Sequence, residues 1–317
     1  MDLTELFEFY YDLKISASNR SEITKLKYKK LFTTILKNFG NIDIYSIKPS
    51  YYQMKMNQIG KSCGSDHLRR INRLFKKMIL FYQLDGHDDL KDFTRGYEVF
   101  SKIPSKHRQD KFIHSLDDYH RVLESCQSRF NYDYSVSYYY LYLLFSTGLR
   151  PSELLALTWS SINFKHSTLK VGNRISTVTL VRSGPKNLAS DREIPVNTEC
   201  VKVLSELKQK QRAMLSSHNM QNKEDLVFYH WNYKNMLPIN ATLRKSLFIV
   251  LDDLEIPRIS LYGARHTRLS VLMNSPDLSL EVISKYAGHT DINMLISIYG
   301  GVSTKKQEEE FEIIQQI

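Results

Sequence analysis

The stretch TGLRPSEL, residues 147–154, follows the apolar run YYYLYLLF after one intervening residue, Ser146. A helix that ends at Gly148 and a second helix that begins at Pro151 would hold Arg150 at the junction between them. An arginine in that place can bind a phosphate with two N–H groups, and the N-terminus of the new helix adds partial positive charge. An ion pair with Glu153 is the alternative role for the same arginine. The stretch therefore predicts a helix–helix junction that presents either an anion site or a local ion pair.

Two more motifs lie downstream of this junction. YGARHT occupies residues 262–267, and AGH occupies residues 287–289 and is followed by Tyr299. Taken singly each motif is ordinary, because a lone histidine is usually structural and a lone tyrosine is usually a half-buried hydrophobic residue. Their meaning depends on the three motifs occurring together and in this order.

The composition is that of a folded, basic protein. A length of 317 residues suggests about two domains, and 42% hydrophobic with 25% charged residues can build a core, which argues against disorder. The net charge of +10 and the pI near 9.2 favour a polyanionic partner, either nucleic acid or an anionic membrane surface.

Several classes of protein are disfavoured by the sequence. No apolar run is long enough for a membrane span, and the N-terminus MDLTELFEFYYDLK is no signal peptide. Cys63, Cys126 and Cys200 are far apart and form no CxxC pair, so neither a zinc site nor a disulfide framework is supported. We therefore expect reduced thiols in a cytoplasmic protein, with no metal, no cofactor and no membrane partner.

The chain is expected to have two domains. Apolar residues at helical spacing predict a helical domain at 1–100. Residues 101–114 (SKIPSKHRQDKFIH) contain a proline, many basic residues and few apolar anchors, which indicates an interdomain linker. A mixed domain is expected at 115–303, opened by a capping box at 115–118, and a short amphipathic tail helix at 304–317. The expected fold class is mainly α with a small antiparallel β-sheet (α+β).

Hydrophobic periodicity also gives the individual elements. Helices are expected near 3–11, 21–39, from Pro49 onward, 65–82, 115–127, 133–148, 151–157, 198–215, 239–253, 263–274 and 279–287. Strands rich in Val, Ile, Leu and Thr are expected at 168–175, 177–181 and 192–196.

The helix expected at 65–82 carries a basic face beside its apolar stripe. The cations of this face are Arg69, Arg70, Arg73, Lys76 and Lys77. Such a face is usually a solvated helix surface, whereas in a DNA-binding protein it contacts phosphates. Lys106 and Arg108 in the linker are further candidates for contacts with a DNA backbone.

Together the three motifs resemble the boxes of the tyrosine recombinase (phage integrase) family. TGLRPSELLALTW resembles the first box, YGARHT the second and YAGHTDINMLISIYGGV the third, with a basic β-rich insert between the first two. The resemblance covers about 113–303, and the helical front half resembles the core-binding domain of the family. It implies a site-specific recombinase that cuts and rejoins DNA without metal or ATP, integrating or excising a mobile element or phage.

The resemblance assigns roles to individual residues. Tyr299 matches the nucleophile, which would attack the scissile phosphate, form a 3′-phosphotyrosyl link and free a 5′-hydroxyl. Arg150 and Arg265 match the two arginines that stabilise the charge of the phosphorane-like transition state. His289 matches a histidine that hydrogen-bonds the phosphate or assists proton removal from the tyrosine, whose ordinary pKa is about 10.

The family also uses a lysine on a β-hairpin as the general acid for the leaving 5′-oxygen. Lys186, shortly before the R-x-I-P segment at 192–195, is the residue that resembles it. Lys170 and Arg182 are the competing candidates.

The second box departs from the family pattern, which usually reads H-x-x-R. Tyr262 stands where the first histidine belongs; its phenol can donate a hydrogen bond to a phosphate oxygen but is no cation at neutral pH. We expect supporting roles for His266, in the helix of the second box, and for Glu153, which would orient Arg150.

The implied partners are double-stranded DNA, held between the two domains, and further copies of this chain in a DNA-induced tetramer. The tail, with Phe311 and Ile314 as apolar anchors, would dock on a neighbouring subunit or pack on its own domain. DNA-bending or directionality proteins are candidate accessory partners, and the expected location is the nucleoid in the cytoplasm.

Three alternatives to an integrase remain at this point: a chromosome- or plasmid-resolving recombinase, a type IB topoisomerase-like enzyme, and a catalytically inactive DNA-binding relative. The last is suggested only by Tyr262. Larger integrases carry an additional N-terminal domain that binds arm-type sites. Here the core-binding pattern begins almost at Met1, so this member is expected to lack that domain or to be a shortened form.

Overall fold

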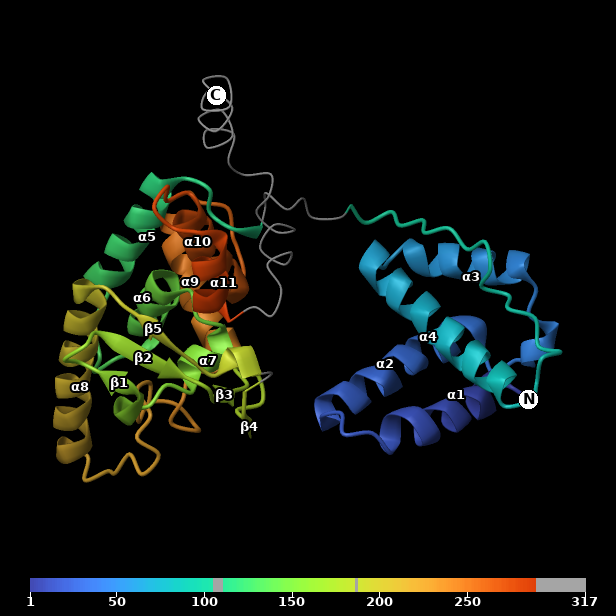
Figure 1. Cartoon of the computed structure of the whole chain (residues 1–317), viewed down its shortest axis with the longest axis horizontal. Coiled ribbons are helices and arrows are strands. Elements are labelled where there is room, and N and C mark those ends of the chain that lie inside the picture. Colours follow the sequence, from blue (N-terminus) through green and yellow to red (C-terminus); the bar gives the residue numbers. More distant parts are fainter. Residues whose placement is uncertain (105–110, 186–187, 289–317) are drawn as a thin grey trace, which may run out of the picture. The chain divides into compact units, whose positions relative to one another are not determined.

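In the computed structural model of the protein, residues 1–104, 111–185 and 188–288 are described (Figure 1). The chain divides into two compact units, Met1–Lys106 and His107–Ile317. Each unit has a hydrophobic core of its own, and the elements of each pack within that unit.

The first unit is helical. Its elements are α1 (Leu3–Tyr11), η1 (Asp12–Ser16), α2 (Glu22–Phe39), η2 (Ile44–Ser46), α3 (Pro49–Gly60) and α4 (Ser65–Leu84). Local signals in the sequence set where these helices begin and end. Ser21 caps the start of α2, Gly40 ends α2 at φ 74°, and Pro49 is the first residue of α3.

The core of this unit forms around the apolar stripe of α4. Leu68, Ile71, Leu74, Phe75 and Ile79 are all buried there. Since the stripe faces inward, the basic residues between its members are left on the surface of the unit.

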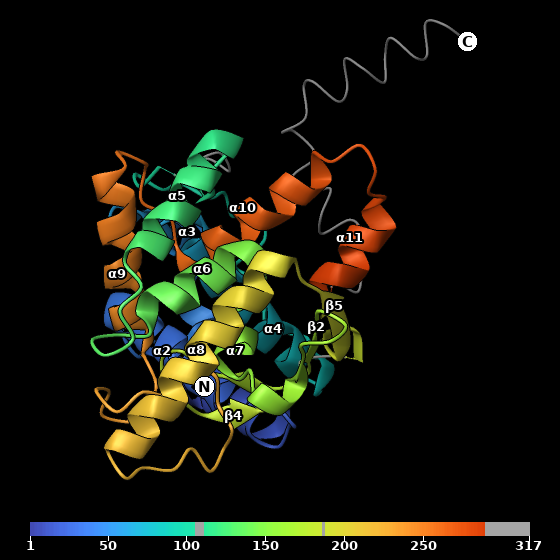
Figure 2. The ribbon, with the colours of Figure 1, turned by 90° about the vertical axis from the view of Figure 1, so that its left-hand side faces the viewer.

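The second unit surrounds one buried helix. Its helical elements are α5 (Leu116–Ser128), α6 (Ser137–Thr147), α7 (Pro151–Leu155), η4 (Trp159–Ser161), η5 (Leu188–Ser190), α8 (Thr198–Ser217), α9 (Asn240–Asp253), α10 (Leu261–Met273) and α11 (Leu280–Ala287). α6 packs against α5, α8, α9 and α10 (Figure 2). Nearly all its side chains are buried, which explains why its sequence is apolar on every face.

The strands of the second unit form two small antiparallel sheets. β1 (Ile162–Asn163), β2 (Thr168–Val171) and β5 (Arg192–Pro195) pair in the order β1-β2-β5, with Leu169 opposite Ile194. β3 (Arg174–Ile175) and β4 (Arg182–Ser183) form a separate hairpin inserted between β2 and β5. The predicted α+β class is therefore confirmed.

The strand expected at 192–196 is β5, whereas the other two strand predictions are wrong in detail. The predicted strand 168–175 is divided between two sheets, and 177–181 is the loop of the β3–β4 hairpin. In that loop Leu180 adopts φ 55° and donates its N–H to the Ser176 carbonyl at 2.8 Å. The loop has strand-like composition, but Val178 and Val181 are exposed, so composition there reflects no buried sheet face.

One helix cap and one helix start differ in part from prediction. Ser115 caps α5 as expected by accepting from the Asp118 N–H at 3.2 Å, but the Asp118 carboxylate accepts from Arg121, so only half of the predicted box is present among the described residues. α6 begins at Ser137 because the preceding residues form a tight turn with a bridge between Asn131 and Ser135. Among the described residues, no helix combines the length and the apolar character needed to cross a bilayer.

Candidate active site and basic surface

Arg150 lies at the predicted junction, as the N-cap residue of α7. Gly148 ends α6 in the left-handed conformation with φ 63°, and a Cβ on this residue would lie 3.0 Å from the Arg268 Cγ. Glycine is therefore required by both the backbone and the packing. Pro151 begins α7 directly afterwards, so the backbone on both sides of Arg150 is fixed.

The local ion pair between Arg150 and Glu153 is present, with 2.6 Å between Nη1 and Oε1. Glu153 also accepts the backbone N–H of Arg150 through Oε2, at 3.0 Å. A guanidinium has five N–H groups, and with the described residues Arg150 uses one of them on Glu153 and one on the Gly288 carbonyl. The ion pair thus orients the side chain and, as far as the described residues show, leaves N–H groups for a further acceptor.

Glu153 is buried between two guanidiniums. Its Oε2 also pairs with Nη2 of Arg192, the first residue of β5, at 3.2 Å. Burial alone would raise the pKa of the Glu153 carboxyl, but Arg192 and Arg150 outweigh burial and hold that pKa below its ordinary value. The carboxylate is therefore ionised and shared between residues from α7 and β5.

Three arginines from separate elements converge on the C-terminus of α11. The acceptors are the consecutive backbone carbonyls of residues 286–288, and the donors are Arg192 Nε to Tyr286 at 2.7 Å, Arg265 Nη2 to Ala287 at 2.7 Å and Arg150 Nη2 to Gly288 at 2.9 Å. The carbonyl end of a helix lacks internal hydrogen-bond partners and carries partial negative charge, which favours cations there. Arg150 of the first motif and Arg265 of the second thereby donate to backbone carbonyls of the third motif, Gly288 and Ala287.

Arg265 makes the most buried of these links, since only 3% of the residue is exposed. Its Nη1 donates to the Gly148 carbonyl at 2.8 Å, while its Nη2 donates to Ala287. One side chain from α10 therefore bridges the end of α6 and the end of α11. The Tyr286 hydroxyl adds a parallel link by donating to the Thr147 carbonyl at 2.7 Å.

The two other candidates of the second motif lie in different environments. Tyr262 is half exposed near the start of α10, and its hydroxyl is close enough to Tyr140 to add to the effect of burial in raising the pKa of Tyr140. Tyr140 donates to the Pro151 carbonyl at 2.7 Å, so Tyr262 lies near the Arg150 junction. His266 is mostly buried, and burial, then Arg265, lower its pKa to about 4, so the imidazole is neutral near pH 7.

Several predicted site residues lie outside the described ranges: Lys106, Arg108, Lys186, His289, Tyr299, Phe311 and Ile314. Both competitors of Lys186 are described. Lys170 lines a cleft of about 240 Å³ together with Glu153 and Asp191. Arg182 instead pairs with Glu224 at the inserted hairpin.

Arg192 was not among the predicted site residues. The R-x-I-P segment that begins at Arg192 predicts a strand after the candidate lysine, but it does not by itself predict a site residue. A single arginine at the start of a strand gives no sign that its partners are a carboxylate 39 positions away and a carbonyl 94 positions away.

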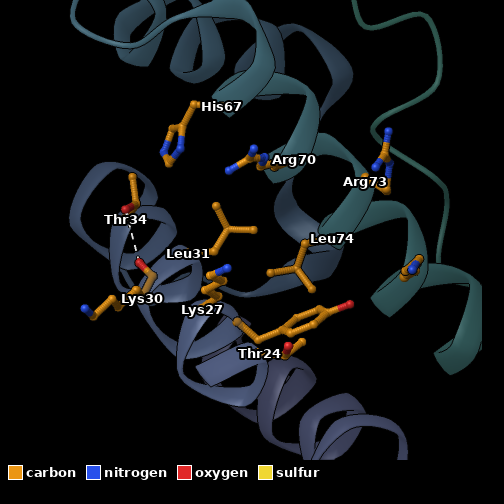
Figure 3. A pocket seen from close by; sticks show the side chains of 11 residues that line it. Thr24, Lys27, Lys30, Leu31, Thr34, His67, Arg70, Arg73 and Leu74 are labelled. Atoms are coloured by element: carbon orange, nitrogen blue, oxygen red, sulfur yellow. Dashed lines mark hydrogen bonds between the residues drawn. The ribbon is translucent and has the colours of Figure 1, made fainter. Parts of the chain in front are cut away.

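The first unit has a separate basic surface, a cleft of about 500 Å³ between α2 and α4 (Figure 3). Its apolar floor contains Leu31 and Leu74. Its cations are Lys27 and Lys30 from α2 and Arg70, Arg73 and Lys77 from α4. We call these five residues the basic cleft; none of the described residues that line the cleft is acidic.

The basic cleft contains only part of the predicted face of α4. Arg69 points elsewhere and pairs with Asp66 at 3.3 Å, and Lys76 is exposed outside the cleft. The two cations from α2 were not predicted, because their place beside α4 depends on how the two helices pack.

The phage integrase family model matches residues 115–306, which is more than half of the chain. The chain belongs to this family. A curated relative, the tyrosine recombinase XerC-like protein of Caldanaerobacter subterraneus subsp. tengcongensis, is 24% identical over 94% of this chain and 79% of its own length. The family consists of DNA strand-transferring enzymes, and this chain is a site-specific DNA recombinase of the integration and excision type.

Solved structures of the same fold agree with this assignment. The Tn1549 transposon integrase in complex with a circular intermediate DNA matches with a TM-score of 0.75 and 18% identity, covering 99% of both chains. A lambda integrase tetramer bound to a Holliday junction matches with a TM-score of 0.63 and 12% identity, covering 92% of this chain and 78% of the other. The recombinase thus shares its fold with integrases of mobile elements.

Proposed function

We propose that this recombinase cleaves DNA through Tyr299, with Arg150 and Arg265 binding the scissile phosphate. The observation that carries the proposal is the convergence of these two guanidiniums, from different motifs, on the carbonyls that immediately precede His289 in the sequence. Residues scattered through the sequence are thereby linked at one place, which an incidental set of motifs would not require.

The proposed role of both arginines is to stabilise the negative charge that develops on the scissile phosphate. Attack by a phenolic oxygen on a phosphodiester increases negative charge on the non-bridging oxygens, and preorganised guanidiniums stabilise that charge without a metal. Arg150 is oriented by Glu153, so little reorganisation is needed when the phosphate arrives. The 3′-phosphotyrosyl link then keeps the bond energy for rejoining, so no ATP is consumed.

The remaining roles complete the proton transfers. Lys186 is the proposed general acid for the leaving 5′-oxygen, with Lys170 as the alternative because it shares a cleft with Glu153. His289 would hydrogen-bond the phosphate or accept the proton of Tyr299, and Tyr262 would donate to a phosphate oxygen. His266 is assigned a supporting role, since a neutral and mostly buried imidazole suits packing better than charge stabilisation.

Double-stranded DNA is the proposed partner, contacted in the first unit through the basic cleft. Residues 1–100 would be the core-binding domain, 101–114 a linker with Lys106 and Arg108 on the backbone, and 115–303 the catalytic domain. Exchange between two duplexes needs four subunits. A tetramer with the tail of 304–317 docked on a neighbour is therefore proposed, supported by the lambda integrase tetramer on its junction. Accessory DNA-bending or directionality proteins would act on this assembly.

The test of the proposed function is a suicide substrate nicked beside the cleavage site. We expect a covalent protein–DNA adduct with the unmodified protein and none with Tyr299→Phe, which removes only the attacking oxygen. Exchange between two duplexes would then select a recombinase over a topoisomerase-like enzyme. Bound DNA without any adduct would leave only the inactive DNA-binding relative.

The general acid is tested with a 5′-bridging phosphorothiolate, whose thiolate leaving group needs no proton. Lys186→Ala should cleave ordinary DNA slowly and the thiolate substrate at nearly the normal rate. The matched variant Lys170→Ala should cleave both substrates alike. The reverse pattern would move the general acid to Lys170.

A further inference from the structure

Arg192 has no role in the mechanism above, although it contacts the site at two points. Its Nη2 donates to Glu153 at 3.2 Å and its Nε to the Tyr286 carbonyl at 2.7 Å. Its Nη1 lies 3.3 Å from the Ser190 carbonyl, at the end of the inserted segment that contains the β3–β4 hairpin. The guanidinium therefore joins α7, α11 and the return of the insert.

We propose that Arg192 is a positioning residue for strand cleavage, holding Arg150 and the C-terminus of α11 in one fixed arrangement. The inference rests on the proposed function, because Arg150 and the residues after α11 are the groups that it would position. Each of the three guanidinium nitrogens of Arg192 donates to an acceptor of the surrounding chain, namely Tyr286, Ser190 and Glu153. Arg192 therefore acts on the chain around it, whereas Arg150 uses only two of its N–H groups on described residues and is also the more exposed, at 16% compared with 8%.

The carboxylate of Glu153 shows how this positioning works. Oε1 pairs with Nη1 of Arg150, while Oε2 accepts from the Arg150 backbone N–H and pairs with Arg192. Both oxygens are thus directed by cations on opposite sides. Without Arg192 the carboxylate would keep only its two hydrogen bonds to Arg150, and the orientation of Arg150 would be held less firmly.

The close packing around Gly288 supports the same arrangement independently. Gly288 has φ 67°, and a Cβ on it would lie 2.8 Å from Nη1 of Arg192 and 2.9 Å from the Ala189 carbonyl. The last residue before His289 is therefore packed directly on the Arg192 guanidinium. A side chain there would have to displace the guanidinium that holds Tyr286 and Glu153.

The experiment measures single-turnover cleavage of the nicked substrate at saturating DNA, using the full chain. We expect Arg192→Met, which keeps an unbranched stem but removes the guanidinium with its charge and donors, to cleave about 100-fold more slowly, since small misplacements of reacting groups have effects of that size. DNA affinity should be unchanged because the Arg192 guanidinium donates to Tyr286, Ser190 and Glu153 within its own unit. Gly288→Ala, which perturbs the guanidinium from the other side, should lower the rate in the same direction.

A pH profile separates positioning from a general loss of folded protein. Glu153 is faced by Arg150, by Arg192 and, across the small cleft, by Lys170 and Asp191. Removal of Arg192 takes away one of the two cations that keep the carboxyl ionised, so its pKa should rise. Cleavage by Arg192→Met should then fall at a higher pH on the acid side than cleavage by the unmodified protein. Adding Glu153→Gln should abolish that difference.

The leaving group provides the second discriminating measurement. If Arg192 acts through Arg150 and α11, the 5′-phosphorothiolate will not rescue Arg192→Met, whereas it should rescue loss of the general acid. Rescue, or an acid limb unchanged from that of the unmodified protein, would overturn the inference. So would cleavage at the normal rate.

Two controls keep the result interpretable. If Arg192→Met fails to fold, Arg192→Lys carries the test: lysine can pair with Glu153 but cannot also reach the Tyr286 carbonyl in the same geometry, so a smaller loss of about tenfold is expected. Normal cleavage by Arg192→Lys would then refute the inference. A lack of adduct with the unmodified protein is a separate outcome, because it refutes the proposed function itself.

Discussion

The two units of the recombinase use positive charge in opposite ways. In the second unit Arg150, Arg192 and Arg265 are largely buried and hydrogen-bonded to carbonyls and to Glu153. In the first unit the basic cleft consists of lysines and arginines on the surface, and the described residues that line it include no acidic one (Figure 3).

The difference indicates what each group of charges can do. A buried, hydrogen-bonded guanidinium holds one position, so it can stabilise charge that appears at one point during a reaction. Exposed cations keep their rotamer freedom and follow a phosphate backbone wherever it runs, which gives affinity and salt dependence without exact placement. The buried set should therefore govern the rate of cleavage, and the exposed set should govern binding.

The largest effect is expected from removing a buried arginine, which tests whether the buried set governs the rate of cleavage. Arg150→Ala or Arg265→Ala should lower adduct formation by about 1000-fold or more, because loss of a preorganised donor to the transition state has effects of that order. DNA binding, measured by mobility shift, should persist. Cleavage preserved in both variants would contradict the assignment of the two residues to the scissile phosphate.

The second test concerns the buried imidazole beside Arg265. The pKa of His266 is about 4 in the folded chain and about 6.5 when unfolded, so the unfolded chain binds more protons between these values. Stability should therefore fall as pH drops from about 6.5 toward about 4, by on the order of 2 kcal/mol for a side chain that is not fully buried. Urea unfolding across this range checks it, and His266→Gln should remove this part of the pH dependence. Equal slopes in both proteins would show that His266 is solvated.

The smallest effects are expected in the basic cleft. Replacing Arg70 and Arg73 with alanine should weaken binding several-fold and reduce the salt dependence by about one unit of log–log slope per lost phosphate contact. The cleavage rate at saturating DNA should stay the same. Arg69→Ala is the matched control, because this neighbouring arginine pairs with Asp66 outside the cleft and should change binding less. Equal losses from both changes would make the face of α4, and not the cleft, the binding surface.

Local signals in the sequence predicted much of the fold and the junction at Arg150. Gly148 and Pro151 specify a helix end and a helix start by their own backbone preferences, so no tertiary information was needed to place Arg150 between them. Ser21, Gly40 and Pro49 delimited helices of the first unit for the same reason.

The features that could not be predicted from the sequence depend on contacts between residues that are far apart in it. Arg192 donates to the backbone carbonyl of Tyr286. Because every residue has a backbone carbonyl, no sequence pattern marks Tyr286 as the partner. Lys27 and Lys30 join the basic cleft only because α2 packs beside α4. The loop at 177–181 has the composition of a strand, and the turn at Leu180 uses a positive φ without a glycine to signal it.

The three links at the end of α11 use main-chain oxygens as their acceptors. Substitutions at Tyr286 and Ala287 leave those oxygens in place, whereas inserting or deleting one residue within α11 would rotate the carbonyls by about 100° around the helix axis and separate all of them from their arginines together. Apart from Gly288, where a Cβ would meet Arg192, these three links should therefore depend more on the length of α11 than on its side chains, and a library of single-residue insertions and deletions would reveal that dependence.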